Sequence, residues 1–210
     1  MSTPREELLR HIRQATGKMV LFIGLAIIVL VAVRAWLEPK IEQARVETLK
    51  SQLNETIPQT AYDNDLLQDT VMIRAPELLG TDKPVTLYRA RKNGKPVGVV
   101  FETIAPDGYS GDIHLLVGIY ADGRIAGVRV LEHRETPGLG DKIELKKSPW
   151  ILSFDGKRLT PENEAQWHVK KDGGIFDQFT GATITPRAVV KAVKKALAFY
   201  QQYQDRIWQP

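Results

Sequence analysis

Residues 85–101, VTLYRARKNGKPVGVVF, predict the type of fold. Two runs with the composition of β-strands, 85–90 and 97–101, lie on either side of Asn93 and Gly94. Asn-Gly between such runs is the strongest short signal of a β-hairpin with a two-residue turn. Because hairpins join antiparallel neighbours, the stretch predicts an antiparallel sheet.

Two further segments predict a mixed fold. A second hairpin is expected at 113–120 and 124–131, which flank a short Ala-Asp-Gly turn. A long helix is expected after Thr185, since Thr is a preferred N-cap and Pro186 suits the first helical position. Its apolar face consists of Val189, Val190, Val193, Leu197, Tyr200 and Ile207. We therefore predict an α+β fold with packing helices, in which 150–154 fits either a helix or a strand.

The composition limits the chemistry that the chain supports. Its 210 residues include no cysteine, which excludes iron–sulfur clusters, thiolate zinc sites and cysteine nucleophiles. The 29 basic and 25 acidic residues give a net charge of +4 without a dense basic tract, so we expect no nucleic-acid partner. The four histidines lack the spacing of metal ligands, and we expect no metal site.

An apolar segment precedes the predicted sheet. Residues 19–33, MVLFIGLAIIVLVAV, are all apolar, and the apolar character resumes after Arg34 as far as Leu37. A helix over 19–37 is about 28 Å long, close to the hydrocarbon thickness of a bilayer. We therefore predict one transmembrane anchor in contact with lipid. The positive-inside rule then places the N-terminus in the cytoplasm and 38–210 outside. The basic flank consists of Arg5, Arg10, Arg13 and Lys18.

The apolar segment has two other interpretations. A cleaved signal peptide fits the loose small-x-small pattern of Val33-Arg34-Ala35, but the arginine and the length of the run favour an anchor. A buried core helix would need a polar face, which the segment lacks.

The sequence divides into four predicted parts. Apolar residues recur at helical spacing from Glu38 to Pro58, and 63–68 is a candidate for a second short helix. The parts are a cytoplasmic tail at 1–18, the anchor at 19–37, a helical stalk or linker at 38–80 and a folded domain at 81–210.

Two glycine-rich loops carry the most unusual chemistry. The first, ETPGLGDK at 135–142, has a proline and glycines that let its backbone approach a planar or anionic ligand closely. The second, DQFTGATITP at 177–186, leads into the last helix, whose first N–H groups favour a phosphate. Gly181 and Ala182 leave the Thr183 hydroxyl accessible. Many capped helices begin in this way without a ligand, and the Gly-Lys-Ser/Thr ending of a P-loop is missing.

Several stretches nevertheless resemble one family. Thr180-Gly181-Ala182-Thr183, preceded by Asp177, resembles the Asp-x-x-Ser/Thr-Gly-Ala-Thr signature of covalently flavinylated domains that bind flavin mononucleotide (FMN). GYSG at 108–111, ETPGLGDK at 135–142 and GATITPRAVV at 181–190 together resemble the G-subunit family of Rnf ion-translocating electron-transport complexes. The similarity covers nearly the whole chain, including the apolar segment.

The resemblance implies a covalently bound cofactor. In that family a flavin transferase moves FMN from FAD onto the last Thr of the tetrapeptide, here Thr183, as a phosphoester. Gln178 stands where glycine is common and Thr180 where serine is more frequent, and neither is the acceptor. No separate catalytic residue is expected. Besides Thr183, the expected cofactor-binding residues are Thr180, Gly181, Ala182, Ile184, Thr185, Tyr109, Ser110, Glu135, Thr136, Pro137, Gly138, Leu139, Gly140 and Lys142.

The implied function is electron transfer within a membrane complex. We expect a redox subunit rather than a stand-alone enzyme, in a complex of the bacterial inner membrane that couples ferredoxin–NAD electron transfer to ion translocation. Its FMN-binding domain would be periplasmic, and its partners would be the other membrane subunits and the flavin transferase. One alternative is the C-subunit of the sodium-pumping NADH:quinone reductase, and another is a flavin-free structural scaffold. A hydrolase or transferase is disfavoured because no base–nucleophile pair is visible.

The charge asymmetry around 19–37 generates a prediction about topology. A reporter that is active only outside the cytoplasm, fused after Pro210, should be active in cells. A cytoplasm-only reporter at the same position should be silent, and its activity would refute the orientation.

Overall fold

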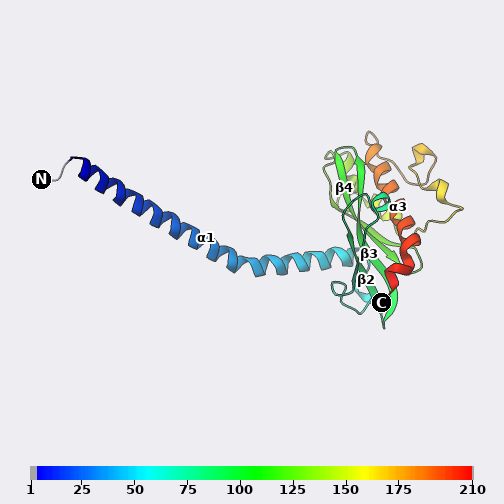
Figure 1. The fold of residues 1–210 in the computed structure, drawn as a ribbon. Helices are drawn as coiled ribbons and strands as arrows, with labels where there is room; N and C mark the ends of the chain where they lie inside the picture. Colours follow the sequence, from blue (N-terminus) through cyan, green and yellow to red (C-terminus); the bar gives the residue numbers. More distant parts are fainter. Residues whose placement is uncertain (1–3, 210) are drawn as a thin grey trace. The chain divides into compact units, whose positions relative to one another are not determined.

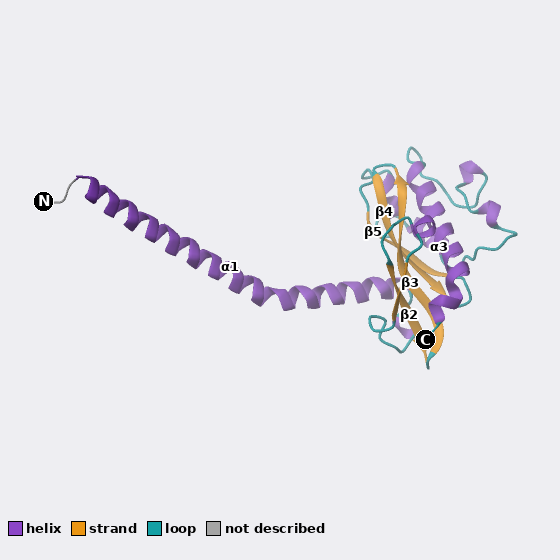
Figure 2. Cartoon of the chain, viewed as in Figure 1, coloured by secondary structure: helices purple, strands orange, loops and turns teal. Residues whose placement is uncertain are grey.

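The computed structural model describes the backbone of residues 4–209 and the side chains of residues 16–209 (Figures 1 and 2). The chain divides into two units, Met1–Thr48 and Leu49–Pro210. Helix α1 (Pro4–Thr56) begins in the first unit and ends in the second.

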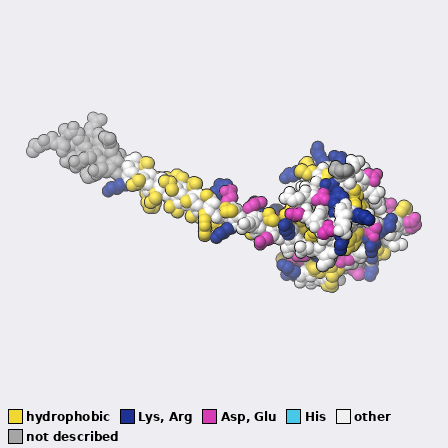
Figure 3. Space-filling model, turned by 90° about the horizontal axis from the view of Figure 1, so that it is seen from below, with side chains coloured by type: hydrophobic (Ala, Val, Ile, Leu, Met, Phe, Trp, Pro, Cys, Tyr) yellow, Lys and Arg dark blue, Asp and Glu magenta, His cyan; other side chains and the backbone are white. Residues whose placement is uncertain are grey.

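The first unit contains the apolar part of α1. From Thr16 onward, this helix is long and apolar enough to cross a membrane, by length and composition. Its hydrophobic side chains are exposed, as in Phe22 at 74%, and they cover this stretch of the helix in Figure 3. None of the apolar window of this helix is buried, so the structure gives no support to the interpretation as a buried core helix.

The second unit is built on a five-stranded antiparallel sheet in the order β1-β2-β3-β4-β5. Both predicted hairpins are confirmed, and Asn93 and Gly94 have the positive φ angles, 51° and 75°, that their tight turn requires. The strands are β1 (Thr70–Ile73), β2 (Val85–Lys92), β3 (Lys95–Gly108), β4 (Gly111–Tyr120) and β5 (Ile125–Glu132).

Helix α3 (Ile184–Trp208) packs on one face of the sheet (Figure 1). The predicted apolar face of this helix is confirmed, since all six of its residues are buried. Residues of alternate strand positions, such as Val99 and Phe101, complete this main core. The rings of Phe101 and Phe199 meet edge to face, with centroids 5.2 Å apart.

The end of α1 packs on the opposite face of the sheet. Leu53 and Ile57 are fully buried in a second, smaller core with Val100 and Leu116. Because strand residues alternate between faces, Val100 points away from its neighbours Val99 and Phe101. Both faces of the sheet are therefore covered.

Three glycines allow the end of α1 to lie close to the sheet. Gly118 and Gly127 are paired across β4 and β5, and Gly98 lies on β3. A Cβ atom at Gly118 would lie 2.9 Å from Cβ of Thr56, and one at Gly127 would lie 3.1 Å from Cα of the same residue. The first distance is shorter than real Cβ atoms show without a shift, and the second is tighter than most real Cβ contacts, so the missing side chains allow the helix to lie against the strands.

The structure differs from the sequence prediction between residues 57 and 80. Helix α1 ends at Thr56, just before Pro58, and 63–68 is not helical. Side chains of this segment bind the β2–β3 hairpin instead: Asn64 accepts from the Arg91 N–H at 2.8 Å, and Asp63 accepts from the Asn93 N–H at 2.8 Å. Such side-chain bonds compete with helix formation.

Other element boundaries also differ. Strand β1 and the short helix α2 (Pro76–Leu79) lie in the stretch assigned to a stalk or linker, and the compact unit begins at Leu49 rather than at residue 81. The ambiguous segment at 150–154 is part of a 3₁₀ helix, Pro149–Phe154. Further 3₁₀ turns are Gln59–Ala61, Gly140–Ile143, Glu164–Gln166 and Lys170–Asp172.

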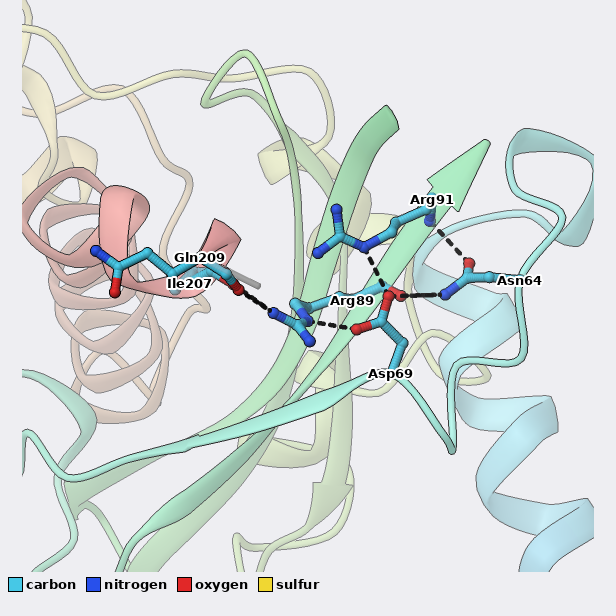
Figure 4. A network of polar contacts seen from close by, with 6 residues as sticks. All are labelled: Asn64, Asp69, Arg89, Arg91, Ile207 and Gln209. Atoms are coloured by element: carbon cyan, nitrogen blue, oxygen red, sulfur yellow. Dashed lines mark hydrogen bonds and ion pairs between the residues drawn. The ribbon is translucent and has the colours of Figure 1, made fainter. Parts of the chain in front are cut away.

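A polar network fixes the C-terminal end of α3 to the sheet (Figure 4). The Asp69 carboxylate accepts from Nε of Arg89 at 2.5 Å and from Nε of Arg91 at 2.7 Å. Nη1 of Arg89 donates to the carbonyls of Ile207 and Gln209, at 3.2 and 2.8 Å. The Arg89 guanidinium thus satisfies carbonyl groups at the helix end that have no partner within the helix.

Leu197→Asp tests the packing of α3. A charge without a partner would be buried in the main core, so we expect a loss of roughly 3–5 kcal/mol of unfolding free energy, or about 10 °C in Tm. Gln202→Asp, at an exposed position of the same helix, is the matched control and should change little. If Leu197→Asp had the same Tm as the wild type, α3 would be shown to be peripheral to the fold.

Gly118→Val tests the close packing of α1 on the sheet. The added side chain would overlap Thr56 and should cost about 1–3 kcal/mol through overpacking. Met72→Val, at an exposed strand position, serves as the control. Equal thermal stability of the two variants would contradict the close packing of α1 on β4.

Candidate cofactor site

A pocket of about 280 Å³ lies where three segments meet. They are the β3–β4 turn, the loop at 135–140 and the stretch at 181–185 that begins α3. Ten of the fifteen predicted cofactor-binding residues line it: Tyr109, Glu135, Thr136, Leu139, Gly140, Gly181, Ala182, Thr183, Ile184 and Thr185.

The other five predicted residues are nearby but do not line the pocket. Thr180 and the Ser110 side chain are exposed, and Pro137 and Gly138 form the exposed tip of the loop. Lys142 lies half-buried in the 3₁₀ turn Gly140–Ile143.

Glu135 joins the three segments of the pocket. Its side chain is buried, at 4% exposure, and one carboxylate oxygen accepts from the Ser110 N–H at 2.9 Å. The other carboxylate oxygen accepts from the Thr185 hydroxyl. Within residues 16–209, no Lys, Arg or His forms an ion pair with Glu135, so hydrogen bonds alone satisfy this carboxylate.

His133 holds the backbone of Glu135 in place. Its Nδ1 atom accepts from the Glu135 N–H at 3.0 Å, and its Nε2 atom is 2.8 Å from Oε1 of Glu144. A ring nitrogen that accepts a hydrogen bond carries no proton, so the proton is on Nε2, which donates to Glu144.

The loop at 135–140 is closed on itself. The Thr136 carbonyl accepts from the N–H groups of Leu139 and Gly140, at 3.1 and 3.0 Å, and the Gly138 N–H donates to Asp141 at 2.8 Å. Gly138 has φ +78°, which favours glycine. A Cβ atom at Gly140 would lie 2.9 Å from both Cβ of Glu135 and Oγ1 of Thr185, so only glycine fits there.

The start of α3 differs in one respect from the prediction. Thr183, not Thr185, occupies the N-cap position, and its side chain makes no capping bond. The prediction that Thr185 caps the helix is wrong: this residue is inside the first turn and its hydroxyl donates to Glu135. Glu135 lies 50 residues away from Thr185, so the sequence gave no sign that this carboxylate would bind the Thr185 hydroxyl.

Several donors at the start of α3 are available to a ligand. Within the described chain, the N–H groups of Thr183, Ile184 and Thr185 have no protein acceptor, and neither has the Thr183 hydroxyl. A helix N-terminus with such N–H groups attracts anions.

An aromatic cluster positions the loop that precedes Thr183. Nε1 of Trp150 donates to the Asp177 carbonyl at 2.7 Å, and the Trp150 ring meets that of Phe179 at a centroid distance of 5.1 Å. Phe154 and Phe176 extend the cluster, with centroids 4.6 Å apart. These residues were not predicted as part of the site, although the concentration of aromatic residues between 150 and 179 was visible in the sequence.

An ion pair joins the first turns of α3 to the 3₁₀ turn Lys170–Asp172. The Arg187 guanidinium, in the first turns of α3, donates to both carboxylate oxygens of Asp172, at 2.6 and 2.9 Å. This hydrogen bonding lowers the pKa of Asp172 below its usual range and raises the pKa of Arg187. Sequence spacing gave no sign of the pair, because 15 residues separate its members.

The pocket fits a phosphate ester of a planar apolar ring. The free N–H groups of α3 suit the phosphate, and the side chains of Tyr109, Leu139 and Ile184 are apolar and exposed, the first at 67%. A Cβ atom at Gly181 would have only Leu139 within 4 Å, at 3.9 Å, so this glycine leaves its side of the cleft open. Among the described residues, no Lys or Arg lines the pocket.

The pocket lies within a stretch that matches a known family of domains. Residues 108–198 match the model of the FMN-binding domain family. A protein of Pseudomonas aeruginosa, named as the G-subunit of an ion-translocating oxidoreductase complex, is 50% identical over 188 residues, which cover 90% of this chain and 87% of the relative. Proteins of the same name from Pseudoalteromonas atlantica and Vibrio cholerae are 50% and 51% identical, over 81% and 80% of this chain and 80% of each relative.

Proposed function

Because this chain belongs to the G-subunit family of ion-translocating oxidoreductase complexes and is an FMN-carrying component of such a complex, we propose that FMN is bound covalently to Thr183. The observation that carries the proposal is the free hydroxyl of Thr183 beside the free N–H groups at the start of α3. A phosphate bonded to this hydroxyl would lie where those N–H groups can donate to it.

The neighbouring threonines are poorer acceptors. The Thr185 hydroxyl is buried and donates to Glu135. Thr180 lies outside the pocket, before Gly181, whose φ of +80° turns the chain. Among Thr180, Thr183 and Thr185, Thr183 is therefore the one with both a free hydroxyl and a place in the pocket.

The proposed attachment exchanges one phosphate bond for another. The Thr183 oxygen bonds to the phosphorus of the FMN half of FAD, the bond from this phosphorus to the oxygen of the AMP half breaks, and AMP leaves. The hydroxyl proton is lost to solvent, and a flavin transferase catalyses the exchange. No electron is transferred in this step.

Bound FMN would supply one- and two-electron chemistry. The residues of this chain would orient it: the α3 N–H groups hold the phosphate, and Tyr109, Leu139 and Ile184 offer apolar surface to the ring. We propose that the protein relays electrons between ferredoxin and NAD within the complex, with its domain in the periplasm and the apolar part of α1 in lipid. The names of the three relatives favour this family over the C-subunit of the sodium-pumping reductase.

Thr183→Val is the decisive variant. Valine keeps the shape and the β-branch of threonine but removes the hydroxyl, so the protein should fold, insert and carry no covalent FMN. The full chain is made together with a flavin transferase, and its intact mass and its in-gel flavin fluorescence are measured after denaturation.

Thr180→Val is the matched control and should keep the FMN mass increment. A full increment on Thr183→Val would place the attachment elsewhere. A wild-type chain without any increment would refute covalent attachment altogether, and a chain without bound flavin of any kind would favour the scaffold alternative.

A further inference from the structure

We propose that Glu135 is the positioning residue of the modification site, and that it presents Thr183 to the flavin transferase by holding the start of α3 and the β3–β4 turn on either side of it. This inference rests on the proposed attachment of FMN to Thr183. It assigns Glu135 an action through Thr185 and Ser110, rather than on the flavin itself.

The contacts of Glu135 reach both walls of the pocket. Its carboxylate binds the Ser110 N–H in the β3–β4 turn and the Thr185 hydroxyl in the first turn of α3. Thr185 is 50 residues away in sequence and Ser110 is 25 residues away. One side chain therefore links three segments that are otherwise held separately. Trp150 holds the stretch before α3, the Thr136 carbonyl closes the loop at 135–140, and strand pairing holds the β3–β4 turn.

The packing around Glu135 leaves it little freedom. A Cβ atom at Gly108 would lie 3.0 Å from Oε1 of Glu135, and one at Gly140 would lie 2.9 Å from its Cβ. Glycine at both positions lets the backbone close around the carboxylate. The His133 ring, which accepts from the Glu135 N–H, holds the backbone of Glu135 in place.

The bond to Thr185 also decides which hydroxyl is free. With its hydroxyl directed to Glu135, Thr185 fixes the rotation of the first turn of α3. Thr183, two residues earlier, then faces the pocket with its hydroxyl unbonded. Without the carboxylate, both the rotation of this turn and the choice of hydroxyl would be less restricted.

Hydrogen bonding, rather than charge, is the basis of this role. Within the described side chains, no cation lines the pocket and Glu135 has no ion-pair partner. A glutamine could accept from the Ser110 N–H and donate to the Thr185 oxygen with nearly the same shape. Alanine could do neither, and it would leave a cavity.

The experiment measures the initial rate of covalent FMN loading. Full-length protein in detergent is incubated with FAD and a flavin transferase, and in-gel flavin fluorescence is followed over time. We expect Glu135→Ala to load at least tenfold more slowly than wild type, and Glu135→Gln to restore the rate to within about threefold. Glu132→Ala removes the same charge from an exposed position at the end of β5 and should load like wild type.

Amide hydrogen exchange of the flavin-free protein gives a second readout. The Ser110 amide should exchange at least tenfold faster in Glu135→Ala than in wild type, and it should remain protected in Glu135→Gln. If Glu135→Ala fails to fold, Thr185→Val and Thr185→Ser replace it: the valine should slow loading, and the serine, which keeps the hydroxyl, should not.

The outcomes separate this inference from the proposed function. If wild type loads and Glu135→Ala loads equally fast, Glu135 is not a positioning residue. If Glu135→Ala and Glu135→Gln are equally slow, charge rather than hydrogen bonding is responsible and the inference is wrong. If wild type itself accepts no FMN, covalent attachment at Thr183 fails, and the positioning role falls with it.

Discussion

The apolar face of α3 packs along the sheet, and this packing fixes the position of the first turn of the helix, where the site lies. Hydrophobic burial is not directional, so polar contacts at the two ends decide how the helix is set on the sheet. Arg89 binds the carbonyls at the C-terminal end, and Glu135 binds Thr185 at the N-terminal end. The pocket thus depends on a helix that is held along its length and at both ends.

The opposite face of the sheet packs against the end of α1. An antiparallel sheet often leaves one face to solvent, but here that face receives the last turns of α1 on Gly98, Gly118 and Gly127. The helix that supplies the apolar stretch therefore ends as part of the folded domain. A glycine in a strand normally weakens it, so three of them beside Thr56 and Ile57 indicate that close packing at this helix end outweighs that cost.

The pocket combines a buried carboxylate with a helix start that favours anions, and among the described residues no cation lines it. Many phosphate sites rely on Lys or Arg. Here the backbone N–H groups of α3 are the available donors, and such neutral donors attract a phosphate less strongly than a charged side chain does. A covalent bond at Thr183 would retain the cofactor without a charged side chain to bind its phosphate, which agrees with the proposed attachment.

The sequence by itself determined both hairpins, the apolar face of α3, the apolar stretch of α1 and ten residues of the pocket, because periodicity, turn residues and motifs are local or carried by resemblance. Only the tertiary structure decided what depends on partners far away in sequence. Asn64 binds the backbone of β2 in place of forming a helix, Thr185 binds Glu135 in place of capping α3, and Trp150 supports the loop before Thr183. In each case a polar group has several local options of similar energy, and the partner that folding brings within hydrogen-bond distance selects one of them.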